Sequence, residues 1–195
     1  MLHYNDAFYH DTLYHHGVKG MHWGVRRYQN KDGSLTKAGK KRYSYAPGDS
    51  VFISGKVSYD RPIDDNVKQV IDEMIRSGVK INIGDAPGAD TRVQDYLASK
   101  KYQNVLVYST DDKVRNNVGN WDVKYFRPQT GSNMTEREIR RLKDIAMTSA
   151  SNKGFAISPS DDRPDSATAL NISRLIGENK PVSVYNFDQE KYKYR

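Results

Sequence analysis

The chain has 195 residues, of which 36% are hydrophobic, so it is long enough for one domain of ordinary size. It contains no cysteine, which excludes a disulfide framework, a thiolate nucleophile and a cysteine-ligated zinc site. The formal net charge is +7, and residues 1–50 hold +4 of it, with eight Lys or Arg against four Asp. A basic segment favours an acidic partner such as nucleic acid, although a solvated basic tail has the same composition.

No apolar run approaches the ~20 residues that span a bilayer, and the first residues lack the pattern of a signal peptide. We therefore expect a cytoplasmic protein with no membrane partner. All histidines lie within the first 22 residues: His3, His10, His15, His16 and His22. They show no repeated helical pair with a carboxylate partner, so we predict no metal site and no required cofactor. The rest of the chain has no histidine for general-base catalysis.

Residues 1–45 are predicted to be a flexible, basic and largely irregular module, because glycines interrupt any helical period. Trp23, Tyr28 and Tyr43 are aromatic anchors with which the module could dock on a partner. Residues 46–50 have the composition of a linker, and residues 188–195 are predicted to be a tail. The folded domain is therefore expected to span residues 51–187.

Within that domain, short apolar runs predict five strands, at residues 51–55, 79–83, 105–108, 154–158 and 182–185. Helical patterns alternate with them. One begins at Asp64 or Asp65, two cover residues 91–101 and 168–176, and a fourth opens with the capping box of Thr135 and Glu138. The apolar face of this fourth helix is expected to carry Ile139, Leu142, Ile145 and Ala146. The alternation predicts an α/β fold, an open parallel sheet of about five strands with helices on both faces.

Between the strand at residues 105–108 and the helix that opens at Thr135, residues 109–134 form a long polar stretch, typical of a functional or mobile loop. Trp121 and Tyr125 could stack on a base or simply pin this loop. Arg61, after the first strand, could clamp a phosphate or lie in solvent.

The segment around which the chain is organised runs from Ile81 to Asp90 and predicts a strand, a glycine turn and a helix start. Gly84 and Gly88 allow a positive φ or the close approach of a bound group. Asp85 or Asp90 could cap the helix. A helix N-terminus after such a turn favours anions, which predicts a site for a phosphate or ribose. A purely structural turn is the alternative.

Ligands of open parallel sheets bind beyond the carboxyl ends of the strands. Small or polar residues follow three strands here, at residues 54–56, 84–90 and 158–171. Neither standard glycine-rich nucleotide motif is present. The candidate ligand-binding residues are Ser54, Gly55, Lys56, Arg61, Gly84, Asp85, Ala86, Gly88, Ala89, Asp90, Ser158, Ser166, Thr168 and Asn171. The catalytic residues, if there are any, are not identified by the pattern.

Four of these segments together resemble the SLOG superfamily, and within it the small YspA-like branch. They are Ile53–Lys56, Gly84–Asp90, Asp165–Ile172 and Asn179–Tyr185. The resemblance implies a Rossmann-like domain that binds a nucleotide or a ligand derived from NAD or ADP-ribose. Lys56 replaces the usual arginine, and Ala167 replaces a glycine. The glutamate-bearing segment of the related phosphoribohydrolases is absent.

The basic run from Tyr14 to Tyr43 is similar to a short module, HGVKGMKWGVRRYQNPDGSLTPAGKKRY, of tailed phages and related elements of Gram-positive bacteria. This resemblance implies a phage or prophage protein in the cytoplasm of a bacterial host or on the virion. Three functions follow as hypotheses. The domain could bind a nucleotide-type ligand and sense or sequester a defence signal. It could instead cleave the N-glycosidic bond of a nucleotide. Alternatively, residues 14–43 could bind a phage structural protein or nucleic acid. The resemblance to the SLOG superfamily also implies that the protein could form a homo-oligomer.

Overall fold

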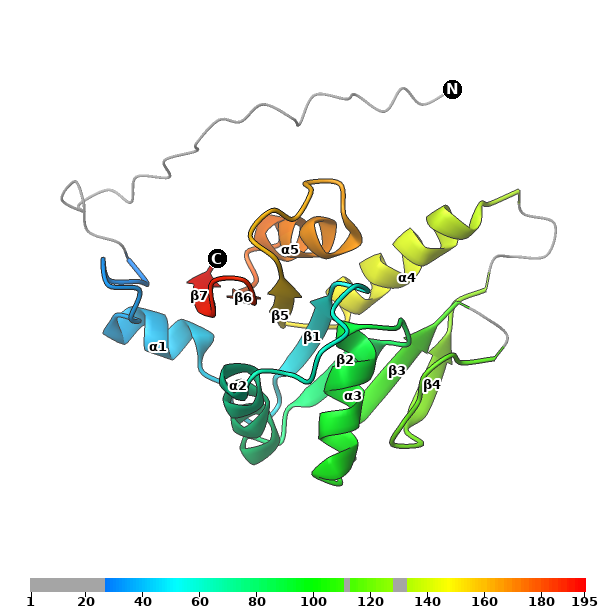
Figure 1. The fold of residues 1–195 in the computed structure, drawn as a ribbon, viewed down its shortest axis with the longest axis horizontal. Coiled ribbons are helices and arrows are strands. Elements are labelled where there is room, and N and C mark those ends of the chain that lie inside the picture. The colour runs from blue at the N-terminus through cyan, green and yellow to red at the C-terminus, as the bar shows by residue number, and fades with distance from the viewer. Residues whose placement is uncertain (1–26, 111–112, 128–132) are drawn as a thin grey trace.

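The computed structural model describes residues 27–110, 113–127 and 133–195, which form one mostly parallel sheet with helices on both faces (Figure 1). The strands are β1 (Ser50–Gly55), β2 (Lys80–Gly84), β3 (Val105–Ser109), β4 (Asp122–Tyr125), β5 (Lys153–Ser158), β6 (Val182–Asn186) and β7 (Lys191–Tyr194). The helices are α1 (Lys37–Tyr43), α2 (Asp65–Arg76), α3 (Ala89–Ser99), α4 (Glu136–Ser149) and α5 (Ala167–Gly177). The strand order is β4-β3-β2-β1-β5-β6-β7, and β7 alone runs antiparallel to its neighbour. The predicted α/β class, with an open, mostly parallel, Rossmann-like sheet, is confirmed.

Two of the seven strands were not expected, and both lie at the edges of the sheet. β4 lies within the polar stretch that was predicted to be a loop, and its four residues are mostly exposed. β7 lies in residues 188–195, which were predicted to be a tail, and it pairs with β6. Edge strands need no continuous apolar run, since one side is left unpaired and polar side chains suit it. The hydrophobic pattern therefore did not reveal them.

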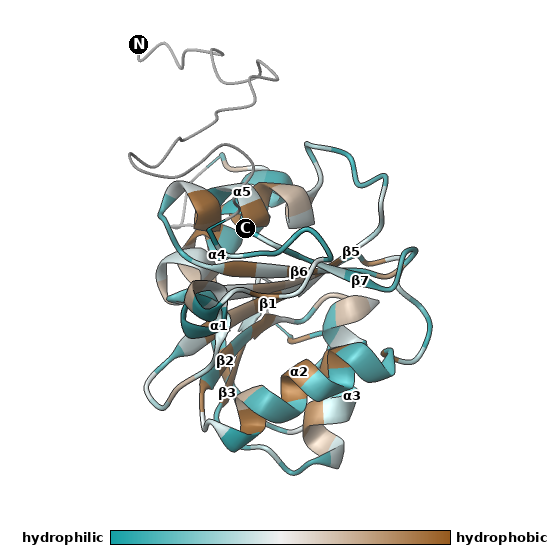
Figure 2. Cartoon of the chain, turned by 90° about the vertical axis from the view of Figure 1, so that its left-hand side faces the viewer, coloured by the Kyte–Doolittle hydropathy of each residue, from teal (hydrophilic) through white to brown (hydrophobic). Residues whose placement is uncertain are grey.

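Two apolar layers hold the sheet between its helices. Figure 2 shows α4 and α5 over one face and α2 and α3 over the other. Side chains alternate along β1, as expected for a strand buried on both faces. Val51 and Ile53 join the core beneath α2 and α3, whereas Phe52 packs in a smaller cluster with Met147 of α4 and Leu175 of α5.

The helix starts were predicted with mixed success. The capping box of α4 is present: the Glu138 carboxylate accepts from the Thr135 backbone N–H at 2.7 Å, and the Thr135 hydroxyl accepts from the Glu138 N–H. Asp64 stands at the N-cap position of α2 but makes no capping bond. Its carboxylate accepts instead from Arg61, at 3.3 Å.

Part of the N-terminal module belongs to the folded body. The predicted irregular segment contains α1, and Gly39, taken as a helix breaker, lies inside it. A Cβ on Gly39 would lie 2.0 Å from the Tyr28 carbonyl oxygen, so glycine permits a close chain contact here. The Tyr43 hydroxyl donates to the Arg195 carbonyl at 2.8 Å, and its ring packs against Tyr194. The remainder of the module, residues 1–26, lies outside the described residues, as do His3 to His22 and Trp23. None of the described helices is both long enough and apolar enough to cross a membrane.

Candidate functional site

The sheet reverses its strand order between β1 and β5, and a cavity opens at the carboxyl end of that region. From β1 the chain builds β2, β3 and β4 on one side and then returns to place β5 on the other. Crevices form at such switch points because the connections leave in opposite directions. A cavity of about 380 Å³ lies here. Seven predicted residues line it: Ser54, Gly55, Gly84, Ala86, Asp90, Thr168 and Asn171. We call it the main cavity.

The other seven predicted residues do not line the main cavity. They are Lys56, Arg61, Asp85, Gly88, Ala89, Ser158 and Ser166. Arg61 donates to the Phe187 carbonyl at 2.7 Å, so its guanidinium is held at the side of the domain by β6. Ser166 is the N-cap of α5 and accepts from the Ala169 N–H at 3.1 Å.

Lys56 and Ser158 meet on one carboxylate and fasten two loops together. The Lys56 ammonium lies 2.5 Å from Asp162 Oδ1, and the Ser158 hydroxyl donates to Asp162 Oδ2 at 2.8 Å. Burial tends to raise the pKa of Asp162, but these two partners outweigh it and hold that pKa below its ordinary value. Lys56 therefore serves to bind the loop after β1 to the loop after β5.

The glycine turn between β2 and α3 is shaped by the chain itself. Gly88 has φ +81° and stands at the N-cap of α3, and a Cβ there would lie 2.3 Å from the Val57 carbonyl oxygen. The Ala89 N–H donates to the Lys56 carbonyl at 3.0 Å. The close approach that was expected for a ligand is thus made at Gly88 by residues 56–57. The expectation that Asp85 or Asp90 caps α3 is wrong, because Gly88 holds that position.

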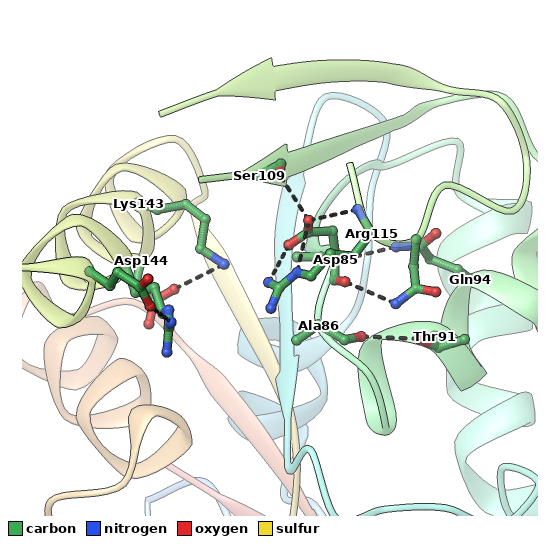
Figure 3. A network of polar contacts seen from close by, with 12 residues as sticks. Asp85, Ala86, Thr91, Gln94, Ser109, Arg115, Lys143 and Asp144 are labelled. Carbon is green, nitrogen blue, oxygen red and sulfur yellow. Dashed lines mark hydrogen bonds and ion pairs between the residues drawn. The ribbon is translucent and has the colours of Figure 1, made fainter. Parts of the chain in front are cut away.

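Asp85 is a fully buried carboxylate that organises the loop after β3 (Figure 3). It accepts from the Ser109 hydroxyl at 2.7 Å, and its second oxygen lies 2.7 Å from an Arg115 guanidinium nitrogen. Burial acts to raise the pKa of Asp85, but the bonds from Arg115 and Ser109 outweigh it and lower that pKa. Asn116 donates to the Asp85 carbonyl at 2.9 Å. The ion pair fixes Arg115 at the wall of the main cavity.

Asp90 is the most perturbed carboxyl group of the main cavity. It is 8% exposed, and a Cβ on Gly84 would lie 2.4 Å from Asp90 Oδ2 and 3.3 Å from the Lys143 ammonium. The missing side chain of Gly84 thus makes room for the carboxyl group and the ammonium. Burial raises the pKa of Asp90 to about 7, against the opposing effect of Lys143 and with a further rise from Asp144. Asp90 consequently carries a proton that it can exchange near neutral pH.

α4 supplies a set of cavity residues that the sequence reasoning missed: Arg140, Lys143, Asp144 and Met147. The predicted apolar face of α4 is wrong in part, since Leu142 and Ile145 are 44% and 43% exposed. Lys143 is 7% exposed instead, because its ammonium turns toward the polar cavity rather than toward solvent (Figure 3). A lysine buried in an otherwise amphipathic helix looks like an ordinary surface residue in sequence. Only the adjacent pair Lys143–Asp144 hinted at a polar inner face.

Lys143 and Asp144 carry opposite charges on the wall formed by α4 and α5. The Lys143 ammonium lies 3.5 Å from Asp144 Oδ1. Burial raises the pKa of Asp144, and the nearby Lys143 and Arg174 oppose that rise. The Asn171 side-chain NH2 group lies 3.5 Å from Asp144 Oδ2, and Arg174 donates to Asn171 Oδ1 at 2.6 Å. The wall therefore offers amide and carboxyl groups in fixed orientations.

The aromatic residues of the long polar stretch do not reach the main cavity. Trp121 is 6% exposed in the core beneath α2 and α3, and its indole N–H donates to the Tyr102 carbonyl at 2.7 Å. Tyr125 is 42% exposed on β4. Of the two roles considered for Trp121, the structure supports pinning the loop.

The main cavity thus combines three kinds of group. Ser54 and Thr168 supply hydroxyls and Asn171 an amide, and Asp90 and Asp144 supply carboxyl groups. The cations are Arg115, from the loop between β3 and β4, and Arg140 and Lys143 of α4. Carboxylates and amides bind sugar hydroxyls, and cations bind phosphate. Among the described residues, no group of three or more His, Asp or Glu side chains is placed to hold a metal ion.

Comparison with known proteins gives one match. The model of a family of unknown function, DUF7211, matches residues 7–30. The match overlaps the segment that resembles the phage module and carries no functional description. No curated protein and no solved structure matches the chain.

Proposed function

We propose that the domain binds a nucleotide, or a ligand derived from NAD or ADP-ribose, in the main cavity. The observation that carries the proposal is the position of the cavity at the switch point between β1 and β5. Polar side chains reach this cavity from the end of β1 and from α3, α4 and α5. A volume of about 380 Å³ is in the range of small-molecule sites. The sequence resemblance to the SLOG superfamily supports the same class of ligand.

The chemistry of the walls suits a ribose. Asp90 and Asp144 face the cavity together with the Thr168 hydroxyl, and each can bond a sugar hydroxyl. Phe52 and Met147 also line the main cavity and provide apolar contact for a base. In a phage protein, which the N-terminal resemblance supports, such binding would sense or sequester a nucleotide signal of host defence.

A second function is favoured by one observation, the buried Asp90 carboxyl group with a pKa of about 7. Such a group can act as a general acid or base at neutral pH. Hydrolysis of an N-glycosidic bond would use it as follows. Water adds its hydroxyl group to the anomeric carbon, the carbon–nitrogen bond breaks, and the base leaves with a proton on nitrogen. Asp90 would accept the proton of the water or supply the proton of the leaving base.

The test uses the full chain, because α1 packs on the folded body. Thermal unfolding and calorimetry with AMP, NAD and ADP-ribose report binding, and chromatography of the recovered ligand reports turnover. A ligand at 100 times its Kd stabilises the fold by about 2.7 kcal/mol. Recovery of intact ligand supports a binding protein, whereas released base that disappears in Asp90→Asn supports the enzyme. No stabilisation by any of these ligands would refute both.

A matched pair of variants localises the binding. Thr168 and Thr148 are both 3% exposed or less, but only Thr168 lines the main cavity. We expect Thr168→Val to weaken binding about tenfold, as for the loss of one hydrogen bond to a ligand. Thr148→Val should leave the affinity unchanged, because the Thr148 hydroxyl bonds the Asp144 backbone carbonyl within α4. Equal affinities of the two variants would place the ligand elsewhere.

A further inference from the structure

A second, smaller cavity of about 190 Å³ lies between α4 and α5 and is lined by arginines. Arg137, Arg140 and Arg141 come from α4, and Arg174 comes from α5. Their spacing explains the cluster, since residues three and four positions apart share one face of a helix. Arg140, Asp144 and Ala167 line both this cavity and the main cavity, so the two lie side by side and share part of their walls. We call this smaller cavity the arginine pocket.

The two cavities differ in how far their positive side chains are balanced by carboxylates. In the main cavity Lys143 lies beside Asp144, and Arg115 is paired with the buried Asp85. In the arginine pocket four guanidinium groups face two carboxylates, Asp144 and Asp165. Arg140 also pairs with Glu136 on the exposed side of α4. Within the described part of the chain, Arg137 and Arg141 form no ion pair, although the Arg141 charge also acts on Glu138, and Asp165 lies 3.9 Å from Arg163. The excess positive charge of this region is therefore concentrated in the arginine pocket.

The arrangement affects the pKa of Arg174. It is partly buried, and burial lowers the pKa of its guanidinium group, as does the like charge of Arg141, while Asp144 opposes both. Arg137, Arg140 and Arg141 are exposed, and like charges gathered around the partly buried Arg174 repel one another unless an anion lies between them. The first turn of α5 begins at Ala167, between the two cavities, and the positive end of a helix dipole also favours an anion there.

We infer that the arginine pocket is the phosphate subsite of the ligand, whose sugar and base occupy the main cavity. Guanidinium groups bind phosphate oxygens through paired, charge-assisted hydrogen bonds. Arg137 and Arg141 supply positive charge that is held in no ion pair among the described residues, and Arg140 lines both cavities. This inference rests on the proposed function. It specifies the ligand class as phosphorylated nucleosides and places the phosphate on α4 rather than at the glycine turn of α3.

The test compares AMP with adenosine by calorimetry on the full chain. The variant is Arg137→Gln combined with Arg141→Gln, two exposed positions whose loss should not disturb the fold. The control is Arg76→Gln, an exposed arginine at the end of α2 on the other face of the sheet. We expect the double variant to bind AMP at least tenfold more weakly and adenosine as well as the unmodified chain does. Arg76→Gln should bind both normally. An equal loss for AMP and adenosine, or the same loss in Arg76→Gln, would overturn the inference.

Inorganic pyrophosphate separates the subsite from the proposed function. It carries the anionic group without sugar or base, and its binding is measured by the same method. Binding that the double variant abolishes supports the subsite even where AMP, NAD, ADP-ribose and adenosine all fail to bind, and in that case the proposed function fails alone. If AMP does not bind and pyrophosphate fails to bind or binds the double variant equally well, the subsite is refuted.

Discussion

Asp90→Asn should stabilise the protein at alkaline pH although it removes the main candidate for proton transfer. The Asp90 carboxyl group is buried, and its pKa rises from an ordinary value of 3.8 to about 7. At about 1.36 kcal/mol per pH unit, that rise corresponds to at most about 4 kcal/mol. Asparagine has nearly the same shape, keeps an oxygen that can accept from the Ala86 N–H, and never carries a charge.

The sign of the pH dependence follows from the proton that is bound. Between about pH 4 and pH 7 the folded protein keeps the proton of Asp90, whereas the unfolded chain has released it. The free energy of unfolding of the unmodified protein therefore falls as the pH rises through this range, and it levels off above about pH 7. The Asn variant has no such pH-dependent loss. Its free energy of unfolding should therefore exceed that of the unmodified protein by nearly zero at pH 4 and by about 4 kcal/mol at pH 8.

Urea unfolding of both proteins at pH 4, 6 and 8 measures this difference, and other titrating groups cancel in the comparison. Asp65→Asn is a matched control, because Asp65 is an exposed acid paired with Lys68 and its pKa is lowered by that bond. Its variant should lose stability relative to the unmodified chain as the pH rises. A constant advantage of Asp90→Asn at all three pH values would refute the reasoning that burial perturbs this group.

Three further predictions concern the frame of the site. Gly88→Ala should lower the free energy of unfolding by about 2–5 kcal/mol, because of the positive φ and the contact with the Val57 carbonyl. The control Gly78→Ala, at φ +65° in open space, should lower it by only about 1–2 kcal/mol. Equal losses of the two variants in urea unfolding would contradict this account. Arg115→Met should destabilise the protein by about 3–5 kcal/mol at pH 7, since Asp85 is left buried and charged, and a loss below 1 kcal/mol in chemical denaturation would show that the pair matters little. Thr135→Ala should lower the thermal midpoint by the equivalent of about 1 kcal/mol through loss of the α4 cap, and an unchanged midpoint would argue against that cap.

Much of the site's frame followed from local patterns. The strand ends at Gly55 and Ser158 were predicted, and the end of β2 was predicted one residue early, at residue 83, because apolar runs stop at small or polar residues. Parallel neighbours must end at the same edge, which brought Ser54, Asp90 and Thr168 to one cavity. The edge strands β4 and β7 were missed, since short polar strands take their structure from a neighbour rather than from their own hydrophobic pattern.

The sequence by itself determined the alternation of strands and helices, because burial on both faces of a parallel sheet leaves a periodic apolar signal. It also located the segments at the carboxyl edge. The tertiary structure alone decided what their residues do. Gly88 admits the chain's own Val57 carbonyl rather than a bound group, and Lys143 of α4 turns inward toward Asp90, 53 positions earlier in the numbering. Charge, burial and pKa depend on neighbours that are distant along the chain, and the packing of α4 and α5 on the sheet brings those neighbours together.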